Sequence, residues 1–123
     1  MQALWDVISV TCVFIVALGL IGAALGVVMA AGGYPDDYRK GDVINGIPAA
    51  EDNCKVFQAG TRLDEKGQVL TNGGRVLCAT ALGNNVTEAQ QLAYKQVQQI
   101  HWNDVYYRKD IGYRAIEREQ MQQ

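Results

Sequence analysis

A charge-free apolar run near the N-terminus constrains this chain more than any other feature. Residues 7–31 read VISVTCVFIVALGLIGAALGVVMAA, twenty-five residues without Asp, Glu, Lys or Arg. About twenty apolar residues are enough to cross a bilayer as a helix. Trp5 stands at the start of the run, where interfacial aromatic residues are common. Gly22 and Gly26 add a GxxxG spacing that supports helix association in membranes. The run by itself therefore favours a membrane-spanning helix.

The end of the run supports a second interpretation. Residues 25–31 (LGVVMAA) form a short apolar block, which Gly32, Gly33 and Pro35 close. This length and punctuation are typical of a buried strand that ends in a tight loop. If the block belongs to a sheet, a spanning helix is limited to residues 7–24, which cover roughly 27 Å. We predict a strand at residues 25–31, and we divide the chain into an apolar segment, 1–24, and a domain, 25–123.

Charge and motif content exclude several functions for the domain. The formal net charge is −2, which argues against nucleic-acid binding and against a polybasic membrane patch. The sequence contains no Walker-type phosphate loop, no dinucleotide fingerprint and no GxSxG elbow. No group of histidines, cysteines and carboxylates has metal-ligand spacing. We therefore predict neither a catalytic residue nor a metal site.

Cysteine usage bears on the compartment. Cys12, Cys54 and Cys78 are an odd number and form no CxxC pair, so we predict three reduced packing residues. All eleven Lys and Arg residues follow residue 31, which favours a cytoplasmic C-terminal part. The expected location is the cytoplasm for residues 25–123, with an anchor in the inner or plasma membrane if residues 7–24 span it.

The pattern after residue 31 predicts a small α+β domain with a mainly antiparallel sheet. Strand composition occurs at residues 55–63, 68–71 and 75–82, and Gly-rich or Asp-rich turns separate these segments. Residues 34–48 are rich in Gly, Pro and Asp and are expected to be mostly loop. The sheet therefore combines the block at residues 25–31 with strands joined by tight turns.

One amphipathic helix is expected to pack on this sheet. Thr87 and Gln90 have the spacing of a capping box, so we predict a helix of about fourteen residues that begins at Thr87. Apolar residues then recur at helical spacing, at Ala89, Leu92, Ala93, Val97 and Ile100. The fold class is thus α+β, with one packed helix, preceded by the apolar segment as a helix.

The candidate binding residues lie in two glycine-rich turns. Gly33 and Tyr34 precede Lys40, in a loop where glycine permits close backbone approach and a cation suits phosphate. Arg75 follows Gly73-Gly74 at the start of a strand, where a guanidinium can hold a carboxylate or phosphate with two hydrogen bonds. A solvated loop and a plain hairpin turn remain the alternatives. A third charged cluster, at residues 108–114, is predicted to be a surface network.

Four segments together resemble a known family. They read LGVVMAAGGYPDDYRKGDVI, KVFQAGTRL, TNGGRVLCATALG and IHWNDVYYRKDIGYRAIEREQ. In this order and spacing they are similar to the C-terminal domain of glycinamide ribonucleotide synthetase, also called phosphoribosylamine–glycine ligase, an ATP-grasp enzyme. The resemblance covers about residues 24–120, whereas residues 1–23 depart from the family pattern.

The resemblance implies a function for the domain within a larger enzyme. The family uses ATP and magnesium to activate glycine as an acyl phosphate, which 5-phosphoribosylamine attacks to give glycinamide ribonucleotide in purine biosynthesis. Earlier domains bind most of the ATP and metal, so this chain alone is expected to bind no cofactor and not to catalyse the reaction. Arg75, Gly33, Tyr34 and Lys40 are expected to position phosphoribosylamine or to shape its cleft.

Three hypotheses remain open from the sequence. The chain is a C-terminal domain fragment without independent catalysis, a membrane-anchored binding or interaction module, or one half of a split ligase completed by a separate ATP-grasp chain. Residues 1–24 are correspondingly a true membrane helix or the product of a frameshift or fusion upstream of the domain.

Overall fold

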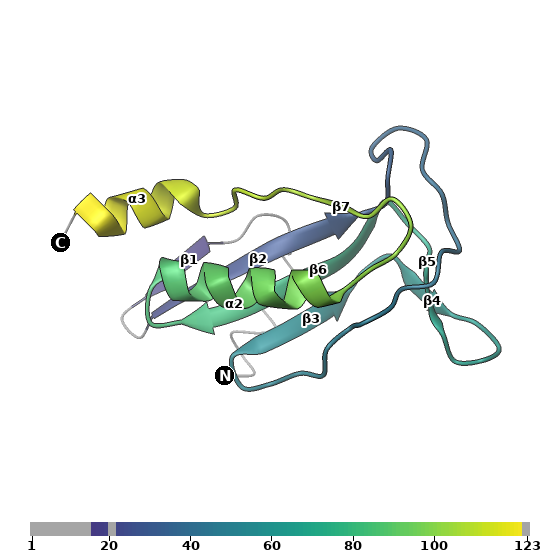
Figure 1. Cartoon of the computed structure of the whole chain (residues 1–123), viewed down its shortest axis with the longest axis horizontal. Helices are drawn as coiled ribbons and strands as arrows, with labels where there is room; N and C mark the ends of the chain where they lie inside the picture. Colours follow the sequence, from purple (N-terminus) through teal and green to yellow (C-terminus); the bar gives the residue numbers. More distant parts are fainter. Residues whose placement is uncertain (1–15, 20–21, 122–123) are drawn as a thin grey trace.

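An antiparallel sheet forms the centre of the domain. The computed structural model describes residues 16–19 and 22–121 (Figure 1). The path through the main sheet is β1-β2-β6-β3, and β7 pairs with the end of β2. The bounds are β1 Val16–Gly19, β2 Gly22–Ala30, β3 Cys54–Gln58, β6 Arg75–Gly83 and β7 Tyr106–Tyr107. A separate hairpin consists of β4, Thr61–Leu63, and β5, Val69–Thr71.

The longest pairing in the sheet joins β2 to β6. The register runs from Ala23 opposite Gly83 to Ala30 opposite Arg75, with an irregularity between Met29 and Ala30. Because paired residues of antiparallel strands share a face, this register sorts the side chains into two sets. One face carries the buried side chains of Leu25, Val27 and Met29 of β2 and of Leu77, Ala79 and Ala81 of β6.

Helix α2, Val86–Gln99, covers this face of the sheet (Figure 1). Its buried apolar positions are Val86, Ala89, Ala93 and Val97, and Ile100 follows as the C-cap. Gln96 is also buried, and its Nε2 donates to the carbonyl of Thr80 on β6 at 2.7 Å. The predicted helix length and apolar stripe are confirmed, although Leu92 is only partly buried.

The prediction of a strand at residues 25–31 is confirmed, but the prediction of a preceding helix is wrong where it can be tested. Val16–Gly19 is strand β1, and β2 already begins at Gly22. The two strands pair from Val16 opposite Leu25 to Gly19 opposite Gly22. An apolar run has no periodicity that separates helix from buried strand, and cross-strand hydrogen bonding satisfies the backbone equally well. Residues 7–15 lie outside the described residues.

No helix within residues 16–19 and 22–121 combines the length and hydropathy needed to cross a bilayer.

The remaining predicted elements differ in detail from those observed. The segment 55–63 is two strands, because Ala59 and Gly60 both donate to the carbonyl of Val76 and interrupt the pairing. A second helix, α3 at Tyr113–Met121, packs against α2, so the expectation of one helix is incomplete. The hairpin at 64–67 is confirmed, with Gly67 at a φ of 80°.

The N-cap of α2 lies two residues before the predicted cap. Asn85, not Thr87, is the N-cap, and its side chain accepts from the backbone N–H of Glu88 at 2.8 Å. Thr87 instead donates its hydroxyl to Glu119 of α3 at 3.2 Å. The Glu119 carboxylate also accepts from the backbone N–H of Val86. Both residue types can cap a helix, and the contact with α3 is a tertiary feature that local spacing does not reveal.

The cysteine prediction is correct for one residue and wrong for another. Cys54 is a buried free thiol, whereas Cys78 is disulfide-bonded. Cys12 lies outside the described residues. Sequence spacing carries no information on which sulfur atoms come within bonding distance in the fold, which is why the pattern misled here.

Candidate functional site

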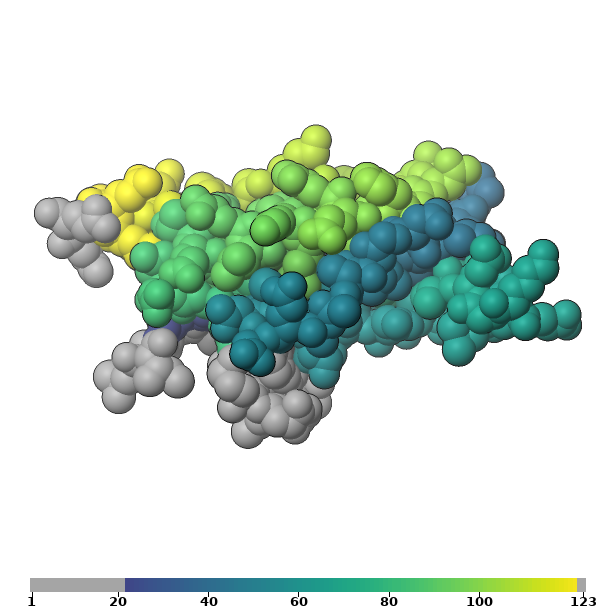
Figure 2. Space-filling view, turned by 60° about the horizontal axis from the view of Figure 1, so that its bottom comes forward, coloured from purple at the N-terminus to yellow at the C-terminus, as the bar shows by residue number. Residues whose placement is uncertain are grey.

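The four predicted site residues meet at one end of the sheet. Ala30, the last residue of β2, is paired with Arg75, the first residue of β6. The backbone N–H of Ala31 donates to the carbonyl of Gly74 at 2.8 Å, which holds the loop after β2 against the turn before β6. The β4–β5 hairpin projects at this end, opposite α3 (Figure 2). The pairing of β2 with β6 therefore brings together two turns that lie far apart in the sequence.

Tyr34 and Arg75 are in direct contact. Arg75 Nε donates to the hydroxyl of Tyr34 at 3.0 Å, and the guanidinium carbon lies 6.0 Å from the centroid of the ring. A Cβ on Gly74 would lie 2.0 Å from Cδ2 of Tyr34, so the ring occupies space that only glycine leaves open. No carboxylate pairs with Arg75 in the part of the chain that the structure describes. The terminal nitrogens of Arg75 thus remain available for an anion.

Tyr38 and Lys40 extend this contact into what we call the Arg75–Lys40 cluster: Arg75, Tyr34, Tyr38 and Lys40. The rings of Tyr34 and Tyr38 are 6.1 Å apart between centroids, and Lys40 Nζ lies 6.0 Å from the Tyr38 centroid. These separations are at the outer range of aromatic and cation–π contact. Two exposed cations therefore flank two partly buried tyrosines.

Gly33 shapes the cluster through its backbone. Its φ is 92°, and a Cβ there would lie 2.1 Å from the carbonyl oxygen of Asp37. Its own carbonyl accepts from the N–H of Asp36 at 2.9 Å. Gly33 is thus a turn residue that positions Tyr34.

Sequence reasoning missed two residues near the cluster. Tyr38 lies between Tyr34 and Lys40, with its ring tilted against that of Tyr34, and the only signal for it was an aromatic residue four positions after Tyr34. Arg62 of β4 comes close to the loop, since a Cβ on Gly41 would lie 3.5 Å from its Nη2. Arg39, in contrast, forms an ion pair with Asp42 at 2.9 Å, so its charge is already neutralised. The cations of this region are thus Arg75, Lys40 and Arg62, and the same loop carries the exposed Asp36 and Asp37.

The segment after α2 packs against the loop that follows β2. Asp104 has a φ of 62°, and a Cβ on Gly32 would lie 2.5 Å from Cβ of Asp104. Trp102 is 7% exposed, and its indole N–H lacks a hydrogen-bond partner within the described residues. His101 pairs through its backbone with Asn45. The side chain of this histidine is exposed.

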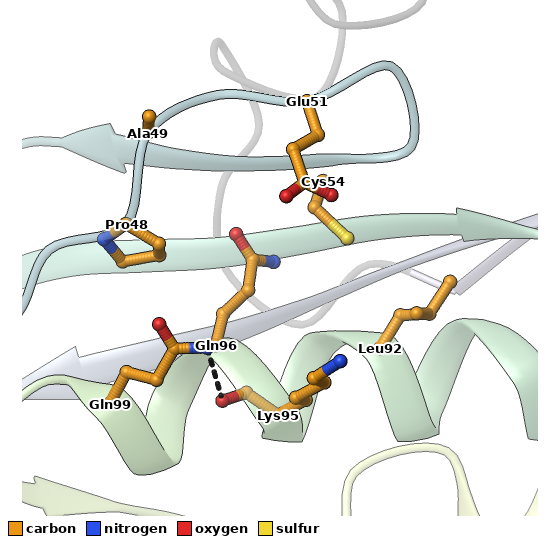
Figure 3. Close-up of a pocket in the computed structure, with 8 residues that line it drawn as sticks. All are labelled: Pro48, Ala49, Glu51, Cys54, Leu92, Lys95, Gln96 and Gln99. Carbon is orange, nitrogen blue, oxygen red and sulfur yellow. Dashed lines mark hydrogen bonds between the residues drawn. The ribbon is translucent and has the colours of Figure 1, made fainter.

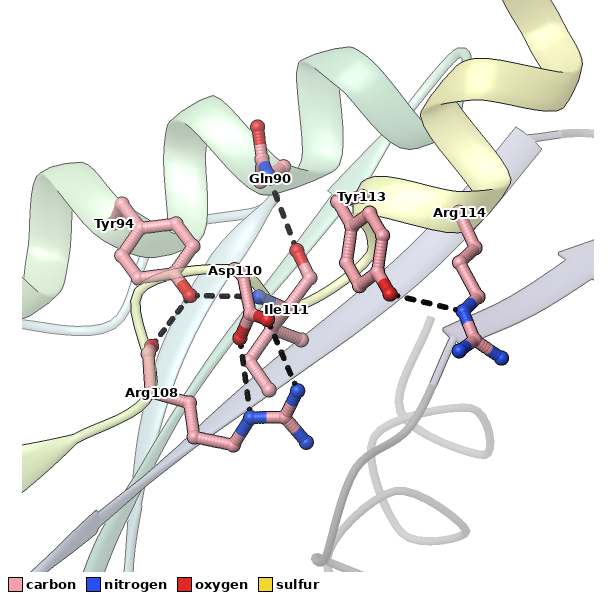
Figure 4. Close-up of polar contacts among 7 residues, drawn as sticks. All are labelled: Gln90, Tyr94, Arg108, Asp110, Ile111, Tyr113 and Arg114. Atoms are coloured by element: carbon pink, nitrogen blue, oxygen red, sulfur yellow. Dashed lines mark hydrogen bonds and ion pairs between the residues drawn. The ribbon is translucent and has the colours of Figure 1, made fainter.

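The third charged cluster holds a loop to α2 (Figure 4). Arg108 donates twice to Asp110, with both distances at 3.1 Å, and this pairing lowers the pKa of the Asp110 carboxyl. The hydroxyl of Tyr94 donates to the carbonyl of Arg108 at 2.6 Å and accepts from the N–H of Ile111 at 3.1 Å. Burial raises the pKa of this phenol. The predicted surface network therefore holds the loop with Arg108 and Ile111 against α2 through Tyr94.

A small cleft lies away from the cluster, between α2 and the chain that leads into β3 (Figure 3). Its walls include Glu51, Cys54, Lys95 and Gln96, and it contains none of the predicted site residues. Over residues 16–19 and 22–121, no three histidine, cysteine or acidic side chains are grouped so as to hold a metal ion.

Comparison with known proteins identifies the domain. The family model described as "Phosphoribosylglycinamide synthetase, C domain" matches residues 24–114. The phosphoribosylamine–glycine ligases of Escherichia coli strain K12 and Vibrio cholerae serotype O1 are 66% and 65% identical over 99 residues. That alignment covers 80% of this chain and 23% of each relative, so the chain spans about a quarter of the length of the curated relatives it matches.

A solved structure agrees with the sequence match. The crystal structure of phosphoribosylamine–glycine ligase from Thermotoga maritima superposes with a TM-score of 0.63 at 37% identity, over 72% of this chain and 22% of that chain. The family match covers most of the chain, and the predicted resemblance is confirmed. This chain belongs to the family of phosphoribosylglycinamide synthetase C domains.

Proposed function

We propose that this chain serves as the C domain of a phosphoribosylamine–glycine ligase in cytoplasmic purine biosynthesis. Such an enzyme joins glycine to phosphoribosylamine with ATP and magnesium. In this proposal the ATP and the metal are bound by an ATP-grasp unit, in the same polypeptide or in a separate chain. This C domain supplies one wall of the cleft for the phosphate-bearing substrate. The family membership and the 66% identity to the Escherichia coli ligase support this assignment.

The observation that carries the substrate role is the contact between Tyr34 and Arg75. The bond from Nε to the tyrosine hydroxyl leaves the two terminal nitrogens of the guanidinium for a ligand. A guanidinium held in one orientation loses less entropy on binding, and its fork matches two phosphate oxygens. Lys40 and Arg62 add positive charge to the same end of the sheet. We infer that this group of cations binds the phosphate of phosphoribosylamine.

Ribose 5-phosphate is a suitable probe, because it carries the phosphate and sugar without the unstable amine. In an NMR titration of the ¹⁵N-labelled chain, we expect saturable shifts of Arg75 Nε and of the backbone around Gly74. Arg75→Met should weaken binding about tenfold, the effect of losing a charge-assisted hydrogen bond. Arg114→Met is the matched control, because that arginine lies on α3, where its Nε donates to the hydroxyl of Tyr113. Equal affinity in the two variants would remove Arg75 from the site.

Catalysis is tested separately from substrate binding. The acyl-phosphate step requires strong neutralisation of the transferred phosphoryl group. We expect the purified chain, given ATP, magnesium, glycine and phosphoribosylamine, to form no product above a no-enzyme control. Addition of an ATP-grasp chain should restore turnover if the two parts act together. Product formation by the chain alone would refute this division of labour.

A further inference from the structure

Helix α3 lies on the surface of the domain, at the end opposite the β4–β5 hairpin (Figure 1). Each of its nine residues is at least partly exposed, and Met121 at its end is 85% exposed. Ala115 and Ile116 pack against the core but are only partly buried. Because the hydrophobic contribution scales with the apolar area removed from water, apolar packing holds α3 weakly.

The chain immediately before α3 is, in contrast, firmly bonded to α2 (Figure 4). The hydroxyl of Tyr94 donates to the carbonyl of Arg108 at 2.6 Å and accepts from the N–H of Ile111 at 3.1 Å. Gln90 Nε2 donates to the carbonyl of Ile111, also at 3.1 Å. Gly112 follows with a φ of 84°. A movement of α3 would therefore begin at Gly112, where the backbone has the freedom of glycine.

The other end of α3 is held by one carboxylate at the start of α2. The Glu119 carboxylate accepts from the backbone N–H groups of Val86 and Thr87 and from the Thr87 hydroxyl, with the two Thr87 contacts at 3.4 and 3.2 Å. Asn85 accepts from the N–H of Glu88, so the first three N–H groups of α2 all have acceptors. The helix dipole also favours a negative charge at this position. Glu119 thus joins the two helices through charge-assisted hydrogen bonds.

We propose that α3 is a lid on this end of the core, hinged at Gly112 and latched by Glu119, which opens while the sheet and α2 stay folded. Opening breaks the bonds of Glu119 and removes Ile116 from the core. It leaves the bonds of Gln90 and Tyr94 to the preceding loop intact, so it costs less free energy than unfolding of the whole domain. The proposal is independent of the phosphate site, because the two share no residue.

Hydrogen exchange of the wild-type chain, followed by NMR, tests the lid directly. The amide protons of Val86 and Thr87 are bonded to Glu119, and that of Ile116 is bonded to a carbonyl one turn back at 3.0 Å. Each proton exchanges only when its bond breaks. We expect these three amides to share one protection factor, lower by about tenfold or more than that of Ala79 in the middle of β6, which reports global unfolding.

A core substitution distinguishes opening of the lid from unfolding of the domain. Val97 lies in the last turn of α2 and is 1% exposed. Val97→Ala should raise the exchange rate of Ala79 about tenfold or more, because it leaves a cavity in the core. The rate of Ile116 should stay unchanged, because the core remains folded when the lid opens. Equal acceleration of Ile116 and Ala79 would overturn the proposal.

Glu119→Ala tests the latch. It should raise the exchange rate of Ile116 about tenfold, since it removes charge-assisted hydrogen bonds. Glu117→Ala is the matched control, because it removes the same charge from an exposed position of the same helix. If the two variants have equal Ile116 rates, Glu119 is not the latch. The wild-type comparison decides the question of the lid even if a variant folds poorly, since a common protection factor for Ile116 and Ala79 would show that α3 opens only with the whole domain.

Discussion

At the level of single residues, Gly74 decides whether Tyr34 can reach Arg75. A Cβ at this position would lie 2.0 and 2.4 Å from two carbons of the Tyr34 ring. Gly74→Ala should therefore displace the ring, break the bond to Arg75 Nε and lower the free energy of unfolding by about 1–3 kcal/mol. Urea denaturation measures the stability, and the NMR signal of Arg75 Nε reports the broken bond.

Gly67→Ala is a control that separates a steric clash of the new Cβ from backbone strain. Gly67 has a φ of 80°, but a Cβ there would meet nothing within 4 Å, so alanine costs backbone strain alone, about 1–2 kcal/mol. The Arg75 Nε signal should stay unchanged in this variant. If Gly74→Ala also leaves that signal unchanged, the steric account of the contact between Tyr34 and Arg75 is wrong.

Asp110 provides a prediction about pH. Its carboxyl pKa is lowered mainly by the hydrogen bonds from Arg108. A lowered folded-state pKa means that the pair stabilises the fold above the unfolded-state pKa of about 4, and that this contribution is lost as the pH falls through the folded-state value. Asp110→Asn should therefore lower the urea midpoint at pH 7, and the gap from the wild type should close below about pH 4. A gap that widens on acidification would contradict this mechanism.

The candidate residues illustrate what a sequence reveals about a site. Arg75 and Gly33 could be selected as candidates because glycine turns beside cations have a local signature, and their binding role stays a prediction. Tyr38 and Arg62 could not, because their relation to the cluster depends on a loop that folds back and on a hairpin from another part of the chain. In the structure Gly33 builds the turn that positions Tyr34, and its contact with a ligand stays a prediction.

At the level of elements, the start of α2 tests which of two nearby residues caps the helix. Asn85→Ala should destabilise the domain by about 1 kcal/mol, because it removes the acceptor of the Glu88 N–H. Thr87→Val removes only the hydroxyl bond to Glu119 of α3, and its loss should be smaller. Urea denaturation of the two variants gives both values. If Thr87→Val lowered the free energy of unfolding more than Asn85→Ala, the result would favour Thr87, the N-cap predicted from the sequence.

Elements with strong local signals were predictable, and elements that depend on docking were not. The strands at residues 25–31 and 75–82 and helix α2 combine apolar patterning with clear end signals, and all three are present. Helix α3 has no fully buried residue and packs on α2 through half-buried side chains such as Ile116. Strand β7 has two residues, and it exists only because β2 offers an edge for pairing. Strand β7 is too short to carry an apolar pattern, and the amphipathic pattern of α3 extends over only nine residues.

At the level of the whole molecule, the apolar run and the family resemblance led to different expectations for the same residues. The run alone favoured a helix, whereas the structure continues the sheet upstream of residue 25 through Gly22 and into β1. Backbone pairing with β6 on one side and β1 on the other makes β2 an interior strand, whose residues are buried on both faces. Interior strands lose the polar alternation that usually identifies a strand, which is why the sequence misled here.

The close fit between α2 and the sheet gives the last prediction. Ala89 and Ala93 of α2 and Ala79 and Ala81 of β6 are completely buried, so the two layers meet through methyl groups. Ala93→Leu should force the layers apart and lower the free energy of unfolding by about 1–3 kcal/mol, the usual cost of overpacking. Gln91→Leu introduces the same side chain on the exposed face of the helix and should change the free energy of unfolding by less than about 0.5 kcal/mol. Urea denaturation of both variants separates the packing effect from helix propensity. Equal midpoints would contradict the close packing of α2 on the sheet through these methyl groups.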